Sequence, residues 1–174
     1  MATGSLIKID EEIVTSAVAS VTLGGADWDS SYDVYMVKLN NFSSVTTGAT
    51  PRVRVTKSSS ADTTGNYDYA AKQLRTDTTF GNNSNTNQTS WDILNALSSA
   101  TGNIANGILY LFNFNNAEYS FVTMEITQRS NEGLHRGKQG GAVHTVASAS
   151  DGIEFSMSSG NIASGTFTLY GLKK

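Results

Sequence analysis

The stretch YDVYMVKLNN, from Tyr32 to Asn41, decides the fold of this chain. Tyr35, Val37 and Leu39 would share one face of an extended strand, and the residues between them are also mostly apolar. A strand that is apolar on both faces belongs in the interior of a sheet. We therefore predict a central β-strand at this point of the chain.

A second strand is predicted at PRVRVTK, from Pro51 to Lys57. Val53 and Val55 alternate with polar residues, which is typical of a strand with one buried face. The only proline of the chain, Pro51, stands at the opening position, where its missing N–H group does least harm to a sheet.

Short strand patterns recur along the rest of the chain, separated by Gly-, Asn- and Ser-rich turns. The segments concerned are Leu6 to Ile9 with Ile13 and Val14, Ala17 to Leu23, Tyr67 to Leu74, Ile108 to Phe114, Tyr119 to Thr127, Ala142 to Ala147, Ile153 to Met157 and Gly165 to Leu172. The sequence thus predicts an all-β fold, a single antiparallel β-sandwich of jelly-roll type with about nine strands, formed by residues 1–174 as one domain.

Composition agrees with this fold class and excludes several functions. Charged residues make up 16% of the chain, there are 16 Gly and one Pro, and Ser, Thr and Asn supply much of the polarity, which disfavours a helical bundle. The chain has no Cys and two His, so we expect neither a disulfide framework nor a resident metal or other cofactor. A net charge of −3 argues against nucleic-acid binding. The absence of a signal-peptide pattern and of a long apolar run predicts a protein made in a cytoplasm without membrane insertion.

One long polar loop interrupts the strand pattern. The run from Thr76 to Ser90 is almost wholly polar, so we expect it to face solvent outside the core. The following run, from Trp91 to Ala100, fits either a short helix or the start of a strand, and we favour a short helical or irregular excursion.

Three groups of residues invite a chemical interpretation, but each has a simpler structural one. Asp27, Asp29 and Asp33 could bind calcium, yet their spacing lacks the EF-hand pattern and favours Asx turns. The basic run from His135 to Gly141 could contact an anion, but an exposed turn is favoured. His144 shares a strand face with apolar neighbours, which is typical of a packing residue.

No pattern predicts an active site. Glu118, Glu125 and Glu154 could act as glycosidase carboxylates, but the sequence does not place any two of them at a common cleft. The GxSxG pattern of serine hydrolases does not occur. We therefore expect no catalytic residue and no enzymatic activity, and keep an unrecognised hydrolase as a minor hypothesis.

Exposed aromatic rings could form a platform that binds sugars. The rings concerned are those of Trp28, Tyr67, Tyr69 and Trp91. For the two tyrosines, packing against the sheet is the favoured interpretation, because they would share one face of a strand.

Five stretches together resemble a family of small structural proteins encoded by tailed bacteriophages, many of them from aquatic environments. The stretches are YDVYMVKLNN (32–41), VRVTKS (53–58), YLFNFNNAEYSFVTMEI (110–126), GAVHTVASASDGIEF (141–155) and SGNIASGTFTLYGLKK (159–174), of which the closing SGTFTLYGL is the most specific. The resemblance implies a β-sandwich on the virion surface, as a capsid decoration (cement) subunit or as a module of a fibre or tail, commonly homotrimeric and without catalytic residues.

The resemblance leads to specific expectations about partners. We expect the chain to bind copies of itself as a homotrimer and to bind phage capsid or tail proteins, in a virion assembled in the host cytoplasm. The strands from Tyr32 to Leu39 and from Ala142 to Ala147 are the expected partner surfaces, with Val143, His144 and Val146 as oligomer contacts. The alternative function is a receptor-binding or lectin-like module that binds a host-surface glycan.

Overall fold

The computed structural model describes residues 5–172, and in this part of the chain it contains β-strands and a single short 3-10 turn. Eight strands form a large antiparallel sheet, whose order is β1 (Leu6–Val14), β13 (Ile162–Leu172), β3 (Val34–Ser44), β9 (Ala105–Phe112), β10 (Ser120–Arg129), β11 (His135–His144), β6 (Tyr67–Arg75) and β7 (Gly81–Gln88). Five strands form a small antiparallel sheet, in which β2 (Ser20–Gly24), β12 (Gly152–Met157) and β4 (Pro51–Lys57) lie in that order and both β5 (Ser60–Ala61) and β8 (Trp91–Asp92) pair with β4.

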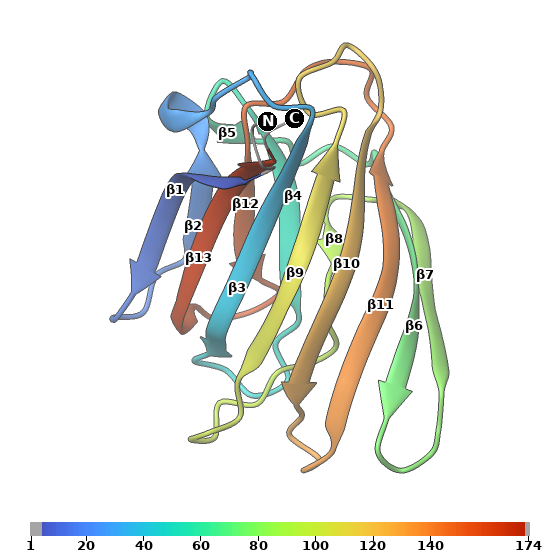
Figure 1. The fold of residues 1–174 in the computed structure, drawn as a ribbon. Helices are drawn as coiled ribbons and strands as arrows, with labels where there is room; N and C mark the ends of the chain where they lie inside the picture. The colour runs from blue at the N-terminus through green and yellow to red at the C-terminus, as the bar shows by residue number, and fades with distance from the viewer. Residues whose placement is uncertain (1–4, 173–174) are drawn as a thin grey trace.

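The two sheets lie face to face (Figure 1), with the large sheet in front of the small one. The predicted all-β sandwich is therefore confirmed, while its jelly-roll connectivity stays a prediction. The chain crosses repeatedly between the sheets, and the three consecutive strands β9, β10 and β11 form a meander in the large sheet. No helix within residues 5–172 is long and apolar enough to cross a membrane.

The core lies between the sheets and follows the alternation read from the sequence. On β3, Tyr35, Val37 and Leu39 are buried against the small sheet, and β3 lies between β13 and β9, inside the large sheet as predicted. On β13, the Phe167 ring is fully buried and packs against Phe42 and Phe155, with ring centroids 5.3 Å and 5.2 Å apart. These aromatic contacts join the two sheets, because Phe155 belongs to the small one.

Two segments expected to be loops are strands. The polar run from Thr76 to Ser90 contains β7, which pairs with β6 as the last strand of the large sheet. Its side chains are mostly exposed, as expected, so backbone pairing rather than apolar burial holds this strand in place.

The Gly-rich run from His135 to Gly141 is part of β11 rather than an exposed turn, and the strand ends at His144 instead of continuing to Ala147. Close packing explains the glycine at 140, because a Cβ atom there would lie 2.3 Å from the Ala70 carbonyl oxygen of the neighbouring strand.

The run from Trp91 to Ala100 forms no helix, so the helical part of the expectation is wrong, whereas the irregular part is confirmed from Ile93 onward and the strand alternative holds for Trp91 and Asp92, which form β8. The run buries Trp91 on β8 and Ile93, Leu94 and Leu97 in the irregular segment. Burial of these four apolar side chains in the core favours this path.

Candidate binding face

The outer face of the large sheet carries a continuous row of apolar side chains across neighbouring strands. Val34 on β3 lies opposite Phe112 on β9, Phe112 opposite Phe121 on β10, and Phe121 opposite Val143 on β11. In the next row, Tyr170, Met36 and Tyr110 lie side by side on β13, β3 and β9. We call these two rows the apolar band: Val34, Met36, Tyr110, Phe112, Phe121, Val143 and Tyr170.

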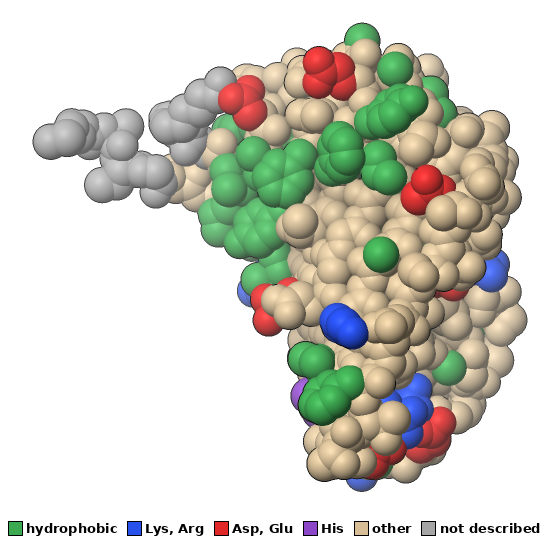
Figure 2. Space-filling view, turned by 90° about the vertical axis from the view of Figure 1, so that its right-hand side faces the viewer, with side chains coloured by type: hydrophobic (Ala, Val, Ile, Leu, Met, Phe, Trp, Pro, Cys, Tyr) green, Lys and Arg blue, Asp and Glu red, His purple; other side chains and the backbone are tan. Residues whose placement is uncertain are grey.

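Part of the apolar band is open to solvent. The exposed fractions of Phe121 and Tyr110 are 44% and 37%, and Tyr119, in the turn before β10, is exposed by 47%. Figure 2 shows a gathering of hydrophobic side chains at the upper left, on the side where the outer face of the large sheet lies. An outer strand face in contact with water alone is usually polar, so this band marks a surface suited to a partner.

A shallow hollow of about 790 Å³ lies at one end of the band. Small residues form its floor, because Thr123, Gly141 and Ala70 lie opposite one another on β10, β11 and β6. Phe121 and Val143 form its apolar side, and polar residues of β6 and β7 form the other side.

The predicted oligomer contacts have different positions. Val143 belongs to the apolar band, and Val146 lies partly buried in the loop after β11. His144 is fully buried and points between the sheets, where its ring packs on Tyr67 with centroids 4.6 Å apart. Its side chain therefore cannot reach a second copy, and the packing interpretation accounts for it.

A serine, a histidine and an acid lie close together inside the sandwich. Ser120 and His144 are opposite each other on β10 and β11, and His144 Nε2 is 3.2 Å from Asp62 Oδ2. Burial lowers the pKa of His144, because the charged imidazolium loses water. Both Ser120 and His144 are fully buried, so a substrate has no access to this cluster, and we interpret it as part of the core.

Lys138 is the other buried ionisable group of note, with an exposed fraction of 2%. It extends from β11 into the space between the sheets, where Nζ donates to Asn83 Oδ1 at 2.7 Å and to the Asp92 carbonyl oxygen. The ammonium also lies 4.9 Å from the centre of the Tyr69 ring. Burial lowers the pKa of Lys138 to about 8. Lys138 thus connects β11, β7 and β8 and is not available to an external anion.

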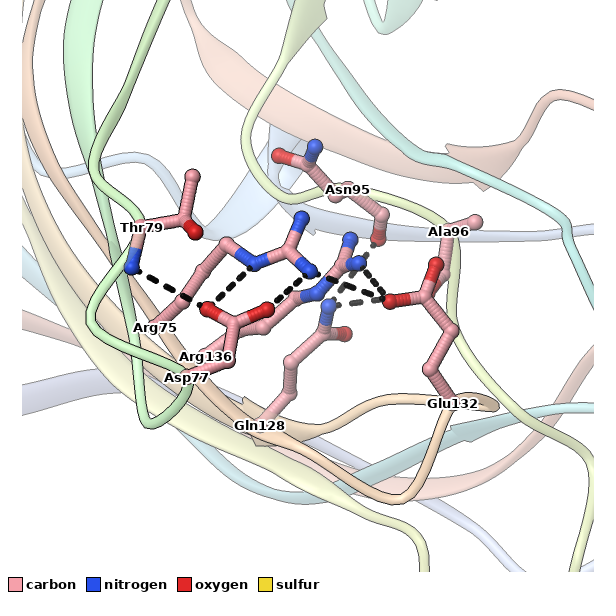
Figure 3. A network of polar contacts seen from close by, with 8 residues as sticks. All are labelled: Arg75, Asp77, Thr79, Asn95, Ala96, Gln128, Glu132 and Arg136. Atoms are coloured by element: carbon pink, nitrogen blue, oxygen red, sulfur yellow. Dashed lines mark hydrogen bonds and ion pairs between the residues drawn. The ribbon is translucent and has the colours of Figure 1, made fainter.

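A network of charges joins the loops at one end of the sandwich (Figure 3). Arg75 binds Asp77 through two hydrogen bonds of 2.6 Å and 3.1 Å, and Arg75 and Arg136 both contact Glu132. Two guanidinium groups face two carboxylates, so the network is balanced in charge. Together with the burial of Lys138, this balance rules against an anion contact in the basic run from His135 to Gly141.

The acidic candidates do not assemble into a site. Asp29 accepts hydrogen bonds from the N–H and the hydroxyl of Ser31 at 2.9 Å and 2.7 Å, which confirms the Asx-turn interpretation for this residue. Glu125 lies on the outer face of the large sheet and Glu154 on that of the small sheet, where it meets Arg54, so the two carboxylates are on opposite sides of the molecule. In the described range, 5–172, no group of acidic or His side chains could hold a metal ion.

The proposed aromatic platform does not exist as a surface. Tyr67, Tyr69 and Trp91 are buried in the core, as expected for the two tyrosines, and Trp28 stacks on Tyr35 with ring centroids 4.1 Å apart. The exposed rings are instead those of Phe121, Tyr110 and Tyr119, and that of Phe80 immediately before β7. The patterns YLFNF and YSFVTMEI could have indicated Tyr110, Tyr119 and Phe121, because aromatic residues lie on one face of these strands while aliphatic residues occupy the other.

Comparisons with protein-family models, with curated proteins and with solved structures find no match to this chain. The functional argument therefore depends on the residues and on the geometry of the binding face.

Proposed function

We propose that this protein is a non-enzymatic structural subunit of a phage virion, a capsid decoration subunit that binds its partners through the apolar band. The observation that carries the proposal is the band itself, which leaves Phe121 and Tyr110 exposed on an otherwise complete sandwich. The resemblance to phage structural proteins is the reason to propose a virion as the location, and the apolar band is the surface through which the subunit would bind its partners.

The contrast within the outer face supports a partner rather than chance exposure. The row beyond the hollow is mostly polar, with Glu125, Gln139 and Lys72 facing water on β10, β11 and β6 and Ile108 as its apolar member on β9. Ile108 and, farther along the face, Leu74 are exposed, but the adjoining apolar rows of the band lie at the other end of the face. A collected apolar patch with a polar border is typical of an interface, whereas single exposed apolar residues are common on any surface.

The absence of accessible chemistry agrees with a structural role. Ser120, His144 and Lys138 are the described residues closest to a catalytic constellation, and all three are buried with no route for a substrate. Subunits on a shell or fibre occupy symmetric positions, and a cyclic oligomer presents identical surfaces to such positions. We therefore propose three copies around one axis, with the apolar band buried between the subunits.

The proposal is tested in phage particles. Purified virions from a phage that carries this gene should contain the protein at high copy number, as measured by quantitative mass spectrometry of particles banded in a density gradient. Particles produced with the Phe121→Asp variant should contain much less of it, whereas Val45→Asp, an exposed position in the loop after β3, should be incorporated normally. Absence of the wild-type protein from banded particles would refute the proposal.

The hollow favours a second candidate function, which is glycan binding. Phe121 offers an exposed ring face, and Asp68, Ser84 and Asn85 place acceptors and donors around the same hollow. An apolar ring beside planar polar groups is a common way to bind a sugar. Saturable binding on a glycan array that is lost with Phe121→Ala would support this candidate, and binding of no glycan would eliminate it.

A further inference from the structure

The two edges of the large sheet differ sharply in how they are protected against pairing. One edge is β1, which contains Lys8, Asp10, Glu11 and Glu12 and has an irregular register between Lys8 and Asp10. Charges and bulges on an edge strand oppose the addition of another strand. The β1 edge is therefore protected in the usual way.

The other edge, β7, lacks this protection over most of its length. Its sequence, GNNSNTNQ, contains no charged residue and no proline. In the part of the chain that the structure describes, β7 pairs with β6 on one side and with no strand on the other. The register is regular from Gly81 to Asn85, and an irregularity with a positive φ at Asn87 follows. Gly81–Asn85 is thus a straight, uncharged stretch with unpaired backbone groups.

Contacts with the core hold this stretch in an extended conformation. Asn83 Oδ1 accepts a hydrogen bond from buried Lys138 at 2.7 Å, and Asn85 Nδ2 donates to the Tyr69 hydroxyl at 2.8 Å. A partner strand would therefore meet an edge that is already ordered, so little conformational entropy would be lost on pairing.

The surroundings of this edge carry few charges; one of them is Lys72 on β6, whose Nζ donates to Asn82 Oδ1 at 2.6 Å. Figure 2, which views the molecule from the side of β6 and β7, shows a broad central area of uncharged polar side chains and backbone with few charges. Phe80, immediately before β7, has an exposed fraction of 67%, the highest among the large hydrophobic residues that remain exposed. A second strand beside β7 would cover part of this ring.

We propose that β7 pairs, in antiparallel orientation, with β7 of a second copy of this chain across a two-fold axis, so that the large sheets of the two copies become continuous. An antiparallel pair of identical strands is self-complementary, as a two-fold interface requires. Identical uncharged strands also meet without repulsion, and facing Asn and Ser side chains can bind one another.

If Asn83 lies on the two-fold axis, all residues from Gly81 to Asn85 can pair with the same stretch of the second copy. Asn82 of one copy then faces Ser84 of the other, and Phe80 lies beside the Thr86 of the partner copy. The contact is separate from the apolar band, so it goes beyond the proposed trimer, and on a shell it would join neighbouring trimers. A short strand contact of this kind is weak alone and becomes strong when many copies act together.

Because the chain has no cysteine, introduced cysteines give an unambiguous test. Asn82→Cys and Ser84→Cys place thiols on the outer face of β7, and Thr22→Cys on the edge strand β2 of the small sheet is the matched control. An equimolar mixture of the two β7 variants should form disulfide-linked dimers under mild oxidation several-fold faster than Thr22→Cys at the same concentration. Thr86→Lys in both chains should slow this reaction, because each lysine would put a charge on the edge strand beside Phe80 of the partner copy.

The outcomes separate this proposal from the trimer. Fast cross-linking that persists in the Phe121→Asp background supports the β7 contact whether or not the trimer exists. Cross-linking of the single β7 variants and of their mixture at the rate of the Thr22→Cys control, at the highest concentration at which the protein is soluble, would overturn it.

Discussion

The buried amine of Lys138 predicts a pH dependence of stability that a single substitution should remove. The pKa of this group falls from its ordinary value of 10.5 to about 8 in the folded protein, because burial removes water from the ammonium. The unfolded chain keeps the proton up to about pH 10.5, so between about pH 8 and 10.5 the unfolded state binds more protons than the folded state. The free energy of unfolding should therefore rise with pH in this window.

The size of the effect follows from the two pKa values. Each pKa unit corresponds to about 1.4 kcal/mol, so the full difference corresponds to about 3 kcal/mol, of which about 2 kcal/mol should be gained between about pH 7.5 and 9.5. Burial raises the pKa of Tyr67, so ionisation of this tyrosine in the unfolded chain lowers stability above about pH 10 and sets the upper limit of the useful range.

Urea unfolding at several pH values in this range, followed by circular dichroism, measures the effect. Lys138→Met removes the titrating group while keeping a side chain of similar length, so the free energy of unfolding of this variant should gain about 2 kcal/mol less than that of the wild type over the same range. Lys72→Met, at an exposed position on β6, is the matched control and should keep the wild-type slope. If the free energy of unfolding rises equally with pH in Lys138→Met and in the wild type, Lys138 is not the source of the pH dependence.

Two further predictions concern packing. Phe167→Ala should lower the free energy of unfolding by about 3 to 5 kcal/mol, because it leaves a cavity between Phe42 and Phe155. The control, Phe80→Ala at an exposed position, should change the free energy of unfolding little, and equal effects of the two variants in urea unfolding would contradict the placement of β13. Gly140→Ala should lower the free energy of unfolding by about 1 to 3 kcal/mol or more, because the new Cβ atom would lie 2.3 Å from the Ala70 carbonyl oxygen. The control is Gly141→Ala, whose new Cβ atom has its nearest contact at 3.4 Å and should be tolerated. Similar melting temperatures for the two variants would contradict the close approach of β11 and β6.

The sequence predicted strands well where apolar burial determines the structure. The segment from Pro51 to Lys57 is β4 with the same bounds, and the closing strand is confirmed with Phe167 and Leu169 facing the core. In both cases, alternating apolar side chains carry the information, because one face of each strand lies against the other sheet.

The sequence did not predict the structure where strand pairing, polar contacts or close packing at glycines, rather than apolar burial, determine the path of the backbone. β7 has no apolar alternation, and its position depends on pairing with β6 and on Lys138, which is distant in sequence. Glycines in β11 suggested a turn, but they permit close contact between strands. The apolar band combines residues of several strands, so its continuity depends on strand order, which local patterns do not contain.

The central claim is that the apolar band is a docking surface, and the mass of the protein in solution tests it most directly. Multi-angle light scattering should give about three times the chain mass of 18.5 kDa for the wild type and for Val45→Asp. Phe121→Asp should remain folded by circular dichroism, because its side chain is partly exposed, but should shift to the mass of one chain. A wild-type protein that stays monomeric at high concentration, or a Phe121→Asp variant that keeps the wild-type mass, would contradict the claim.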